Sequence, residues 1–130
     1  MILGLSLEQV TERQVRAISE TGGLSGIRDH GALESAVAQP TMTAFGADLY
    51  PSLTEKAIAL AFSLIKNHAF IDGNKRVAFY CLEDILALNG YEIRAGDMVK
   101  ASIILEVAAG ERTRESFEEW VEINLYPIED

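Results

Sequence analysis

Apolar residues recur every three to four positions through most of the chain, which is the spacing of one face of an α-helix. Interrupted by capping and turn residues, this pattern predicts an all-α protein, a compact bundle of about six helices in a single domain covering residues 1–130. The expected helices begin after Ser6, Asp29 and Ser52, at Asn74, at Met98 and after Thr113, and they end at Gly22–Gly23, Pro40, Asn67–His68, Asn89–Gly90, Ala109 and Leu125.

Local start and stop signals support these helices. Ser6 and Ser52 are each followed three residues later by Gln or Glu, which is the capping-box pattern. Asn74 is a good N-cap residue, so we expect its side chain to cap the fourth helix. Pro40 is expected to end the second helix, because the residue before a proline is displaced from helical geometry.

Two of the helices are apolar on nearly every side, at residues 57–65 and 77–88. A helix without a polar face has to be buried. Each large apolar side chain contributes roughly 1.5–3 kcal/mol when it leaves water, before entropy is counted. We therefore expect this pair to form the core. Cys81 lies within the second helix and is interpreted as a small core residue rather than a nucleophile.

The remaining helices each carry one apolar face. The expected buried faces are Leu7, Val10, Ala17 and Ile18 in the first helix, Leu33, Ala36 and Val37 in the second, Met98, Ala101, Ile104, Leu105 and Ala108 in the fifth, and Phe117, Trp120, Val121 and Leu125 in the last.

Residues 41–51 have no helical stripe and predict a long loop or a short hairpin, a candidate flap. Residues 91–93 predict a brief extended segment.

Composition narrows the class of protein. The chain is 48% hydrophobic and 24% charged, as in ordinary soluble globular proteins. Its net charge of −9 speaks against non-specific nucleic-acid binding and suits a partner with a basic patch. The N-terminus lacks a signal-peptide pattern, and the longest apolar run is too short to span a membrane. A single cysteine fits a reducing compartment, so we expect a cytoplasmic protein without membrane contact.

Residues 68–76 gather unusual chemistry between the two buried helices. The first turn of the fourth helix carries Lys75 and Arg76, two cations at the positive end of the helix dipole. This unfavourable placement is relieved if an anion binds there, because the free N–H groups, the dipole and the cations all favour it. Three cations and one carboxylate in residues 66–76 make this stretch locally positive in an acidic protein.

Asp72 and His68 add to this picture. A carboxylate beside an anion site is tolerated when a cation such as Mg²⁺ lies between it and a phosphate. His68 can accept a proton from a hydroxyl near neutral pH. Together these groups are typical of transfer of a phosphate-containing group. The residues alone leave another interpretation equally open, in which Asp72–Gly73 is an ordinary turn, His68 a structural residue and the cations a solvated surface.

The stretch His68-Ala69-Phe70-Ile71-Asp72-Gly73-Asn74-Lys75-Arg76 resembles the signature of the Fic/Doc family. The Fic pattern is H-P-F-x-[DE]-G-N-G-R-x-x-R. Here Ala69 replaces the proline, Lys75 replaces the glycine after asparagine, and Phe79 stands in place of the second arginine; the last two exchanges are typical of the Doc (death-on-curing) branch. Residues 22–26 followed by Asp29, the chain length and the helix order are also similar to Doc proteins.

This resemblance implies a Fic/Doc-like fold and a toxin of a toxin–antitoxin module. Doc toxins are protein kinases that transfer the terminal phosphate of ATP to a threonine of elongation factor Tu, which blocks translation. The implied cofactors are ATP and Mg²⁺. The implied partners are elongation factor Tu and a cognate antitoxin that inhibits in trans, since the self-inhibiting Fic pattern [ST]-x-x-x-E-[GN] does not occur in the chain.

The family's roles carry over by position. His68 would be the base on the threonine hydroxyl, Asp72 would hold Mg²⁺, and Lys75 would complete the catalytic set. Phe70 would anchor the loop in the core. The implied phosphate-binding residues are Lys66, Gly73, Asn74, Lys75 and Arg76.

Lys75 bears on which group is transferred. Glycine lets a phosphate chain approach the backbone closely, whereas a lysine side chain fills that space with a charged stem. We therefore expect ATP to bind in the reverse orientation and to offer its terminal phosphate. Two alternatives are a Fic-type adenylyltransferase, which transfers AMP to a protein hydroxyl, and a degenerate member that binds nucleotide or antitoxin without chemistry.

Overall fold

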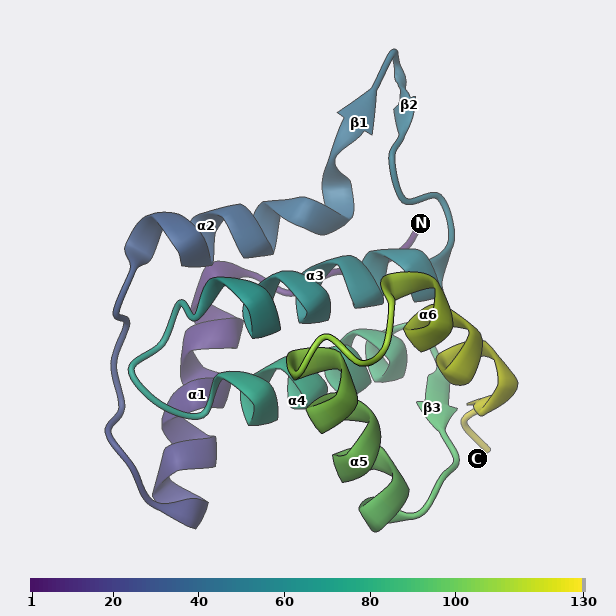
Figure 1. The fold of residues 1–130 in the computed structure, drawn as a ribbon. Helices are drawn as coiled ribbons and strands as arrows, with labels where there is room; N and C mark the ends of the chain where they lie inside the picture. Colours follow the sequence, from purple (N-terminus) through teal and green to yellow (C-terminus); the bar gives the residue numbers. More distant parts are fainter. Residues whose placement is uncertain (130) are drawn as a thin grey trace.

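The computed structural model describes residues 1–129, which form six α-helices, one 3₁₀ helix and two small antiparallel sheets (Figure 1). The expected all-α bundle is confirmed. The elements are α1 (Leu7–Thr21), α2 (His30–Ala38), η1 (Gln39–Thr41), β1 (Thr43–Ala44), β2 (Ala47–Asp48), α3 (Leu53–Asn67), α4 (Asn74–Leu88), β3 (Tyr91–Ile93), α5 (Asp97–Ala108), α6 (Arg114–Ile123) and β4 (Leu125–Pro127). Among the described residues no helix is long and apolar enough to cross a membrane.

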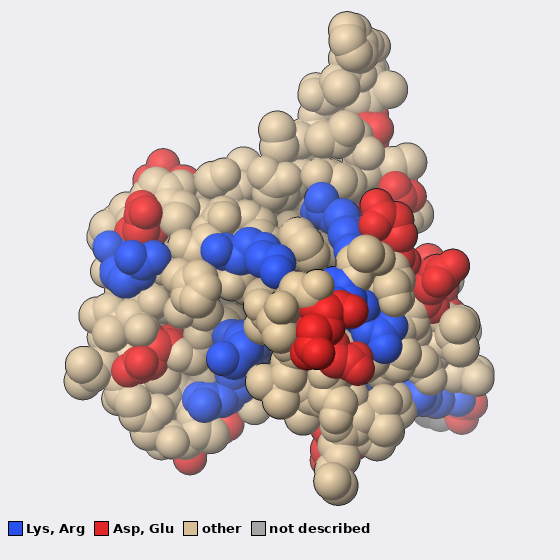
Figure 2. Space-filling view, in the orientation of Figure 1, with Lys and Arg blue, Asp and Glu red and all other residues tan. Residues whose placement is uncertain are grey.

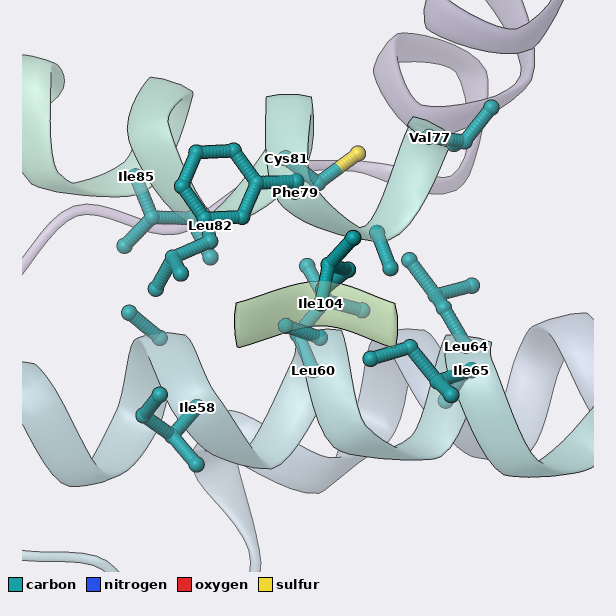
Figure 3. Packing of buried hydrophobic residues seen from close by; sticks show 14 of the residues in the cluster. Ile58, Leu60, Leu64, Ile65, Val77, Phe79, Cys81, Leu82, Ile85 and Ile104 are labelled. Carbon is teal, nitrogen blue, oxygen red and sulfur yellow. The ribbon is translucent and has the colours of Figure 1, made fainter. Parts of the chain in front are cut away.

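Helices α3 and α4 form the centre of the core, as their all-round apolar sequences predict. They run side by side in opposite directions (Figure 1), and α1, α2, α5 and α6 pack around them. Figure 3 shows side chains of α3 and α4 pointing toward one another, with Ile104 of α5 beside them. The core residues labelled there are Ile58, Leu60, Leu64, Ile65, Val77, Phe79, Cys81, Leu82, Ile85 and Ile104.

The predicted helix starts at Ser6 and Ser52 are confirmed. Each serine hydroxyl accepts a hydrogen bond from the N–H three residues later, and the side-chain oxygen of the Gln or Glu at that position accepts one from the serine N–H. Asp29 and Thr113 cap α2 and α6 through their side chains. A side-chain cap of this kind contributes about 1 kcal/mol, so these local signals alone specify where four helices begin.

The buried face of α5 differs from the expected one. Met98 and Leu105 are 86% and 55% exposed, whereas Ile103, Ile104 and Val107 are buried. Apolar residues lie on more than one side of this helix, so periodicity alone does not select a face. Packing against α3 and α4 buries the side that carries Ile103, Ile104 and Val107. Of these three residues, only Ile104 belonged to the expected face.

The C-terminal helix is shorter than expected. Helix α6 ends at Ile123, and Leu125 begins strand β4, which pairs with β3 and places Leu125 opposite Ile93. The strand pairing provides hydrogen-bond partners for a segment that Pro127 prevents from continuing as a helix. The predicted extended segment at residues 91–93 is confirmed as β3, while its partner strand was not anticipated.

Pro40 acts differently from the expectation. Helix α2 ends at Ala38, but Gln39 keeps right-handed helical angles (φ −53°, ψ −48°) and begins η1. Pro40 lies in the first turn of η1, where its missing N–H removes no helical hydrogen bond. The proline therefore marks a change from α-helix to 3₁₀ helix rather than an immediate departure from helical geometry.

Residues 43–48 form a hairpin, the flap hairpin, within the segment predicted as a loop or hairpin. Phe45 and Gly46 both have positive φ (52° and 81°), which is the backbone of a tight two-residue turn. The hairpin projects from the helical body (Figure 1), and Phe45 at its tip is fully exposed.

The base of the flap hairpin is tethered to the helices. Lys56 Nζ of α3 lies 3.2 Å from Asp48 Oδ2 and donates to the carbonyl oxygen of Pro40 at 3.1 Å. The guanidinium of Arg114 lies 4.8 Å from the ring centre of Tyr50 and donates to its hydroxyl. These contacts hold both ends of the projecting segment, while the tip makes none of these tethering contacts.

Cys81 is buried in the core, as expected, and burial together with the nearby Asp84 raises the pKa of its thiol to about 12. Because the thiolate is the reactive form, the native thiol is expected to be inert to iodoacetamide at pH 8 and to react after unfolding. The raised pKa means that its contribution to stability is complete below the ordinary thiol pKa and declines as pH rises toward the folded value. Rapid alkylation of the native protein would contradict this burial.

Candidate active site

Residues 68–73, the motif loop, connect α3 to α4 and begin with a left-handed residue. His68 ends α3 with φ 50° and ψ 52°, a conformation that costs a non-glycine residue roughly 1–2 kcal/mol. Its carbonyl oxygen accepts a hydrogen bond from Arg28 Nε at 2.9 Å. The surrounding contacts therefore compensate for the strain and fix the direction in which the exposed His68 side chain leaves the backbone.

Asn74 does not cap α4, contrary to the expectation. Gly73 is the N-cap residue, in a left-handed conformation (φ 76°, ψ 16°), and Asn74 is the first residue of the helix. The Asn74 side chain instead bridges backward, accepting from the N–H of Phe70 and donating to its carbonyl, both at 3.0 Å. This pair of bonds closes the motif loop on itself, which is why an amide is needed there.

Phe70 is buried in the core and anchors the motif loop, as expected. Replacing it by alanine is expected to lower the free energy of unfolding by about 3–5 kcal/mol, because the large cavity is only partly filled by relaxation. Urea denaturation followed by circular dichroism measures this loss. An unchanged midpoint would show that the loop is not anchored through this ring.

The motif loop opens onto a pocket of about 680 Å³ between the start of α4 and α5. It is lined by His68, Ile71, Asp72, Gly73, Asn74, Lys75, Arg76, Phe79, Tyr80, Glu83, Asp97, Lys100, Ala101, Ile104 and Leu105. Pockets of about 300–1,000 Å³ accommodate small molecules and cofactors. The structure thus brings together every predicted site residue except Lys66.

The anion site predicted at the start of α4 has the expected charge arrangement. Lys75 and Arg76 lie in the first turn, which contains no acidic residue. Arg76 contacts the hydroxyl of Thr21 at the end of α1, whereas no side-chain partner of Lys75 is found within residues 1–129. Figure 2 shows basic side chains over the beginning of α4 on a protein that is acidic overall. Lys75 is thus free to meet an anion in the pocket.

Asp72 offers one carboxylate to a cation. Its Oδ2 accepts from the N–H of Leu24 at 2.8 Å, and Oδ1 has no hydrogen-bond partner among the described residues. Within residues 1–129, no group of three or more His, Cys, Asp or Glu side chains is arranged to hold a metal. One carboxylate beside a phosphate site nevertheless suits Mg²⁺, which takes few protein ligands and completes its shell with water and phosphate oxygens.

Lys66 lies outside the pocket. Its Nζ donates to the carbonyl oxygen of Val107 at 3.0 Å and lies 5.4 Å from the ring centre of Phe62. The ammonium is therefore at the C-terminal end of α5, where the helix dipole attracts a cation. Lys66 was expected at the phosphate site because it lies two residues before His68 in the sequence. On the helix α3, however, these two side chains point in different directions.

The comparison with known sequences agrees with this geometry. The sequence model of the Fic/DOC family matches residues 4–86, more than half of the chain, including the entire motif loop. The chain belongs to the Fic/DOC family. It is also similar to a protein named Toxin Doc from Mycolicibacterium smegmatis, with 47% identity over 74 residues. The matched part covers 57% of this chain and 57% of that relative, so it spans little more than half of the relative's length.

The Fic/DOC match ends in α4, and α5 supplies the opposite wall of the pocket. Lys100 of α5 forms an ion pair with Glu83 of α4, with 2.9 Å between Nζ and Oε2, and Asp97 of α5 also lines the pocket. These three residues were not predicted as site residues. Asp97 and Lys100 come from α5, the helix whose buried face was misjudged, so sequence periodicity gave no indication that they face the motif.

A second segment of this Fic/DOC chain contacts the motif loop from the other side. Residues 23–28, the strap, follow α1 and run beside residues 69–72 (Figure 1). The buried Gln14 of α1 and the exposed Arg28 both donate hydrogen bonds to the motif loop. Neither was predicted, although a glutamine within the apolar face formed by Val10, Ala17 and Ile18 is a recognisable signal of an internal polar contact.

Proposed function

We propose that this Fic/DOC protein is a toxin that transfers the terminal phosphate of ATP to a threonine of elongation factor Tu and so blocks translation. The observation that carries the proposal is the pocket, which combines a histidine, a carboxylate and a cationic helix N-terminus around one cavity. The similarity to a protein named Toxin Doc supports the toxin role.

The start of α4 would bind the phosphates. The first N–H groups of a helix have no acceptor within it, and the helix dipole adds positive potential. Gly73 presents this terminus without a side chain, and Lys75 and Arg76 add two positive charges. A phosphate group placed there would be held by backbone donors and charged side chains together, which is the usual form of a phosphate site at a helix start.

Asp72 would hold Mg²⁺ through the oxygen that Leu24 leaves free. When bound, this ion neutralises charge on the phosphate oxygens and orients them. Mg²⁺ usually has few protein ligands, which agrees with the single carboxylate found here. Asp72 and Lys75 therefore have complementary roles, since one attracts the cation and the other the phosphates.

His68 would act as the base. Its side chain is exposed and lines the pocket, and its backbone is held in a strained conformation that fixes its direction. A histidine in that place can accept the proton of a threonine hydroxyl as the oxygen attacks the terminal phosphorus, while the bond to the bridging oxygen breaks and ADP leaves. We propose that the flap hairpin, whose tip residue Phe45 is fully exposed, contacts the protein substrate.

Lys75 favours transfer of phosphate over transfer of AMP. Its charged stem occupies the place where a glycine would let the phosphate chain lie against the backbone. We infer that ATP binds with its terminal phosphate toward His68 and Asp72. The same proposal includes a cytoplasmic location, where the target and ATP are present, and a cognate antitoxin that inhibits in trans.

The proposal is tested by incubating the purified protein with elongation factor Tu, ATP and Mg²⁺ and mapping the product by mass spectrometry. The expected product carries one phosphoryl group on a threonine, and omission of Mg²⁺ abolishes it. An unmodified elongation factor would contradict the proposed target, and an adduct with the mass of AMP would identify an adenylyltransferase instead.

A further inference from the structure

A buried glutamine connects α1 to both segments that surround Asp72. Gln14 is fully buried. Its Nε2 donates to the carbonyl oxygens of Asp72 and Leu24, at 3.1 and 3.3 Å, and its Oε1 accepts from the N–H of Gly26 at 3.3 Å. All three partners lie outside its own helix. The amide therefore bonds to the strap at two points and to the motif loop at one.

The strap is also paired directly with the motif loop. The N–H of Ile71 donates to the carbonyl oxygen of Gly26 at 3.1 Å, and the N–H of Arg28 donates to that of Ala69 at 2.8 Å. Ile27 and Phe70 form an antiparallel bridge between these bonds. The two segments thus behave as a short two-stranded unit, so a shift of the strap moves the loop that carries His68 and Asp72.

The strap approaches the Asp72 carboxylate most closely at Gly23 and Leu24. The Leu24 N–H donates to Oδ2 at 2.8 Å, a charge-assisted hydrogen bond. Gly23 has φ +107°, and a Cβ there would lie 3.3 Å from both Cβ and Oδ2 of Asp72. A glycine is therefore needed for the backbone to reach the carboxylate, and the N–H that follows it fixes one of the two oxygens.

We propose that Gln14 is a positioning residue for Asp72, acting through the N–H of Leu24. The inference rests on the proposed function, in which Asp72 holds a divalent cation. Gln14 fixes the main chain on both sides of the contact, since it binds the carbonyls of Leu24 and Asp72 together. The Leu24 N–H then occupies Oδ2, and Oδ1, which has no hydrogen-bond partner within residues 1–129, is left for the cation.

Only an amide satisfies this arrangement. Glutamine supplies two donors to the two carbonyls and one acceptor to the Gly26 N–H. Glutamate would place a carboxylate oxygen against two carbonyl oxygens, and methionine would leave all three partners unsatisfied in a buried site. Gln14 therefore stands at an otherwise apolar position because its amide hydrogen-bonds α1 to both the strap and the motif loop.

The decisive test replaces Leu24 by proline and, as its matched control, by alanine. Proline removes the N–H that binds Asp72, whereas alanine keeps it and removes only a side chain that is 66% exposed. The φ of Leu24 is not positive, since Phe45 and His68 are the non-glycine residues with positive φ among residues 1–129. A proline at this position is therefore compatible with the sign of the backbone angle.

The readout is the affinity of the protein for Mn²⁺ in the presence of ATP, measured by electron paramagnetic resonance of the free ion and corrected for the Mn²⁺ that the same concentration of ATP binds without protein. Loss of a group that orients a metal ligand typically weakens metal binding about 10–100-fold. We expect a loss of at least about tenfold for Leu24→Pro and for Gln14→Met, and an affinity like that of the wild type for Leu24→Ala. Thermal unfolding of each variant, recorded in parallel, establishes that the measured protein is folded.

The outcomes separate this inference from the proposed function. If the wild type binds Mn²⁺ with ATP and folded Leu24→Pro binds it equally well, the positioning role is wrong while the metal site remains. If the wild type shows no Mn²⁺ binding with ATP, both are wrong. If Gln14→Met does not fold, the comparison of Leu24→Pro with Leu24→Ala decides alone.

Discussion

The His68→Ala variant is expected to transfer phosphate about 10²–10⁴-fold more slowly than the wild type, which is the usual contribution of a positioned general base. The physical reason is that His68 is the histidine lining the pocket, and alanine leaves the attacking hydroxyl without an acceptor for its proton. The rate of label incorporation into elongation factor Tu from γ-³²P-ATP measures the loss, and the nucleotide affinity is expected to change little.

His30→Ala provides a matched control for this variant. His30 is exposed at the start of α2 and does not line the pocket, so its loss is expected to leave the rate unchanged. Growth arrest on expression offers a second readout in cells. If the wild type arrests growth and His68→Ala arrests it equally, chemistry at His68 is not the cause of toxicity.

The Asp72→Asn variant is expected to lose at least about 100-fold in rate, because a bound metal typically contributes several kcal/mol of charge stabilisation in the transition state and each 1.36 kcal/mol is tenfold. Asparagine keeps the shape of the side chain and an oxygen for the Leu24 N–H, so the fold is expected to persist. The measurement is the phosphate-transfer rate as a function of Mg²⁺ concentration, and a higher Mg²⁺ requirement is part of the expected result.

Asp97→Asn is the control for the loss of a pocket carboxylate. Asp97 lies in the first turn of α5, on the wall opposite the motif loop. Its substitution is expected to leave the Mg²⁺ dependence as in the wild type. If Asp72→Asn retained both the full rate and the wild-type Mg²⁺ dependence, the assignment of the cation to this carboxylate would be wrong.

Much of the helical framework follows from local signals in the sequence. The serines at positions 6 and 52 specify two helix starts through their own hydrogen bonds, and the apolar character of α3 and α4 forces them into the core. These features depend on residues within one turn of each other or on composition, so they can be recognised without knowing the fold.

Features that depend on competing partners were not predictable in the same way. Helix α5 has apolar residues on more than one side, and its packing decided which side is buried. Leu125 fits the helical stripe of α6 but joins a strand, because β3 offers it a partner far away in the sequence. In both cases the sequence pattern permits two structures and a tertiary contact selects one.

The candidate site also contains residues of both kinds, some predictable from local sequence and some placed there only by tertiary contacts. His68, Asp72, Lys75 and Arg76 lie close together in the sequence, and one helix-loop-helix unit necessarily brings them together. Gln14 and Lys100 come from segments distant from the motif, and only the fold places them beside it.

Two residues show how side-chain direction limits such predictions. Asn74 was expected to cap the helix that it begins, but its amide binds Phe70 and Gly73 takes the capping position. Lys66 is near His68 in the sequence, yet its ammonium reaches the end of α5. Neither choice is determined by residue type and spacing, because each side chain had two acceptable sets of partners.

Transfer of the terminal phosphate is tested most directly by two parallel reactions of the wild-type protein with elongation factor Tu, one with γ-³²P-ATP and one with α-³²P-ATP. The expected result is label on elongation factor Tu from γ-³²P-ATP alone, and none when His68→Ala replaces the wild type. Label from α-³²P-ATP would contradict the assignment of the protein as a kinase, because it would show that AMP is the group transferred.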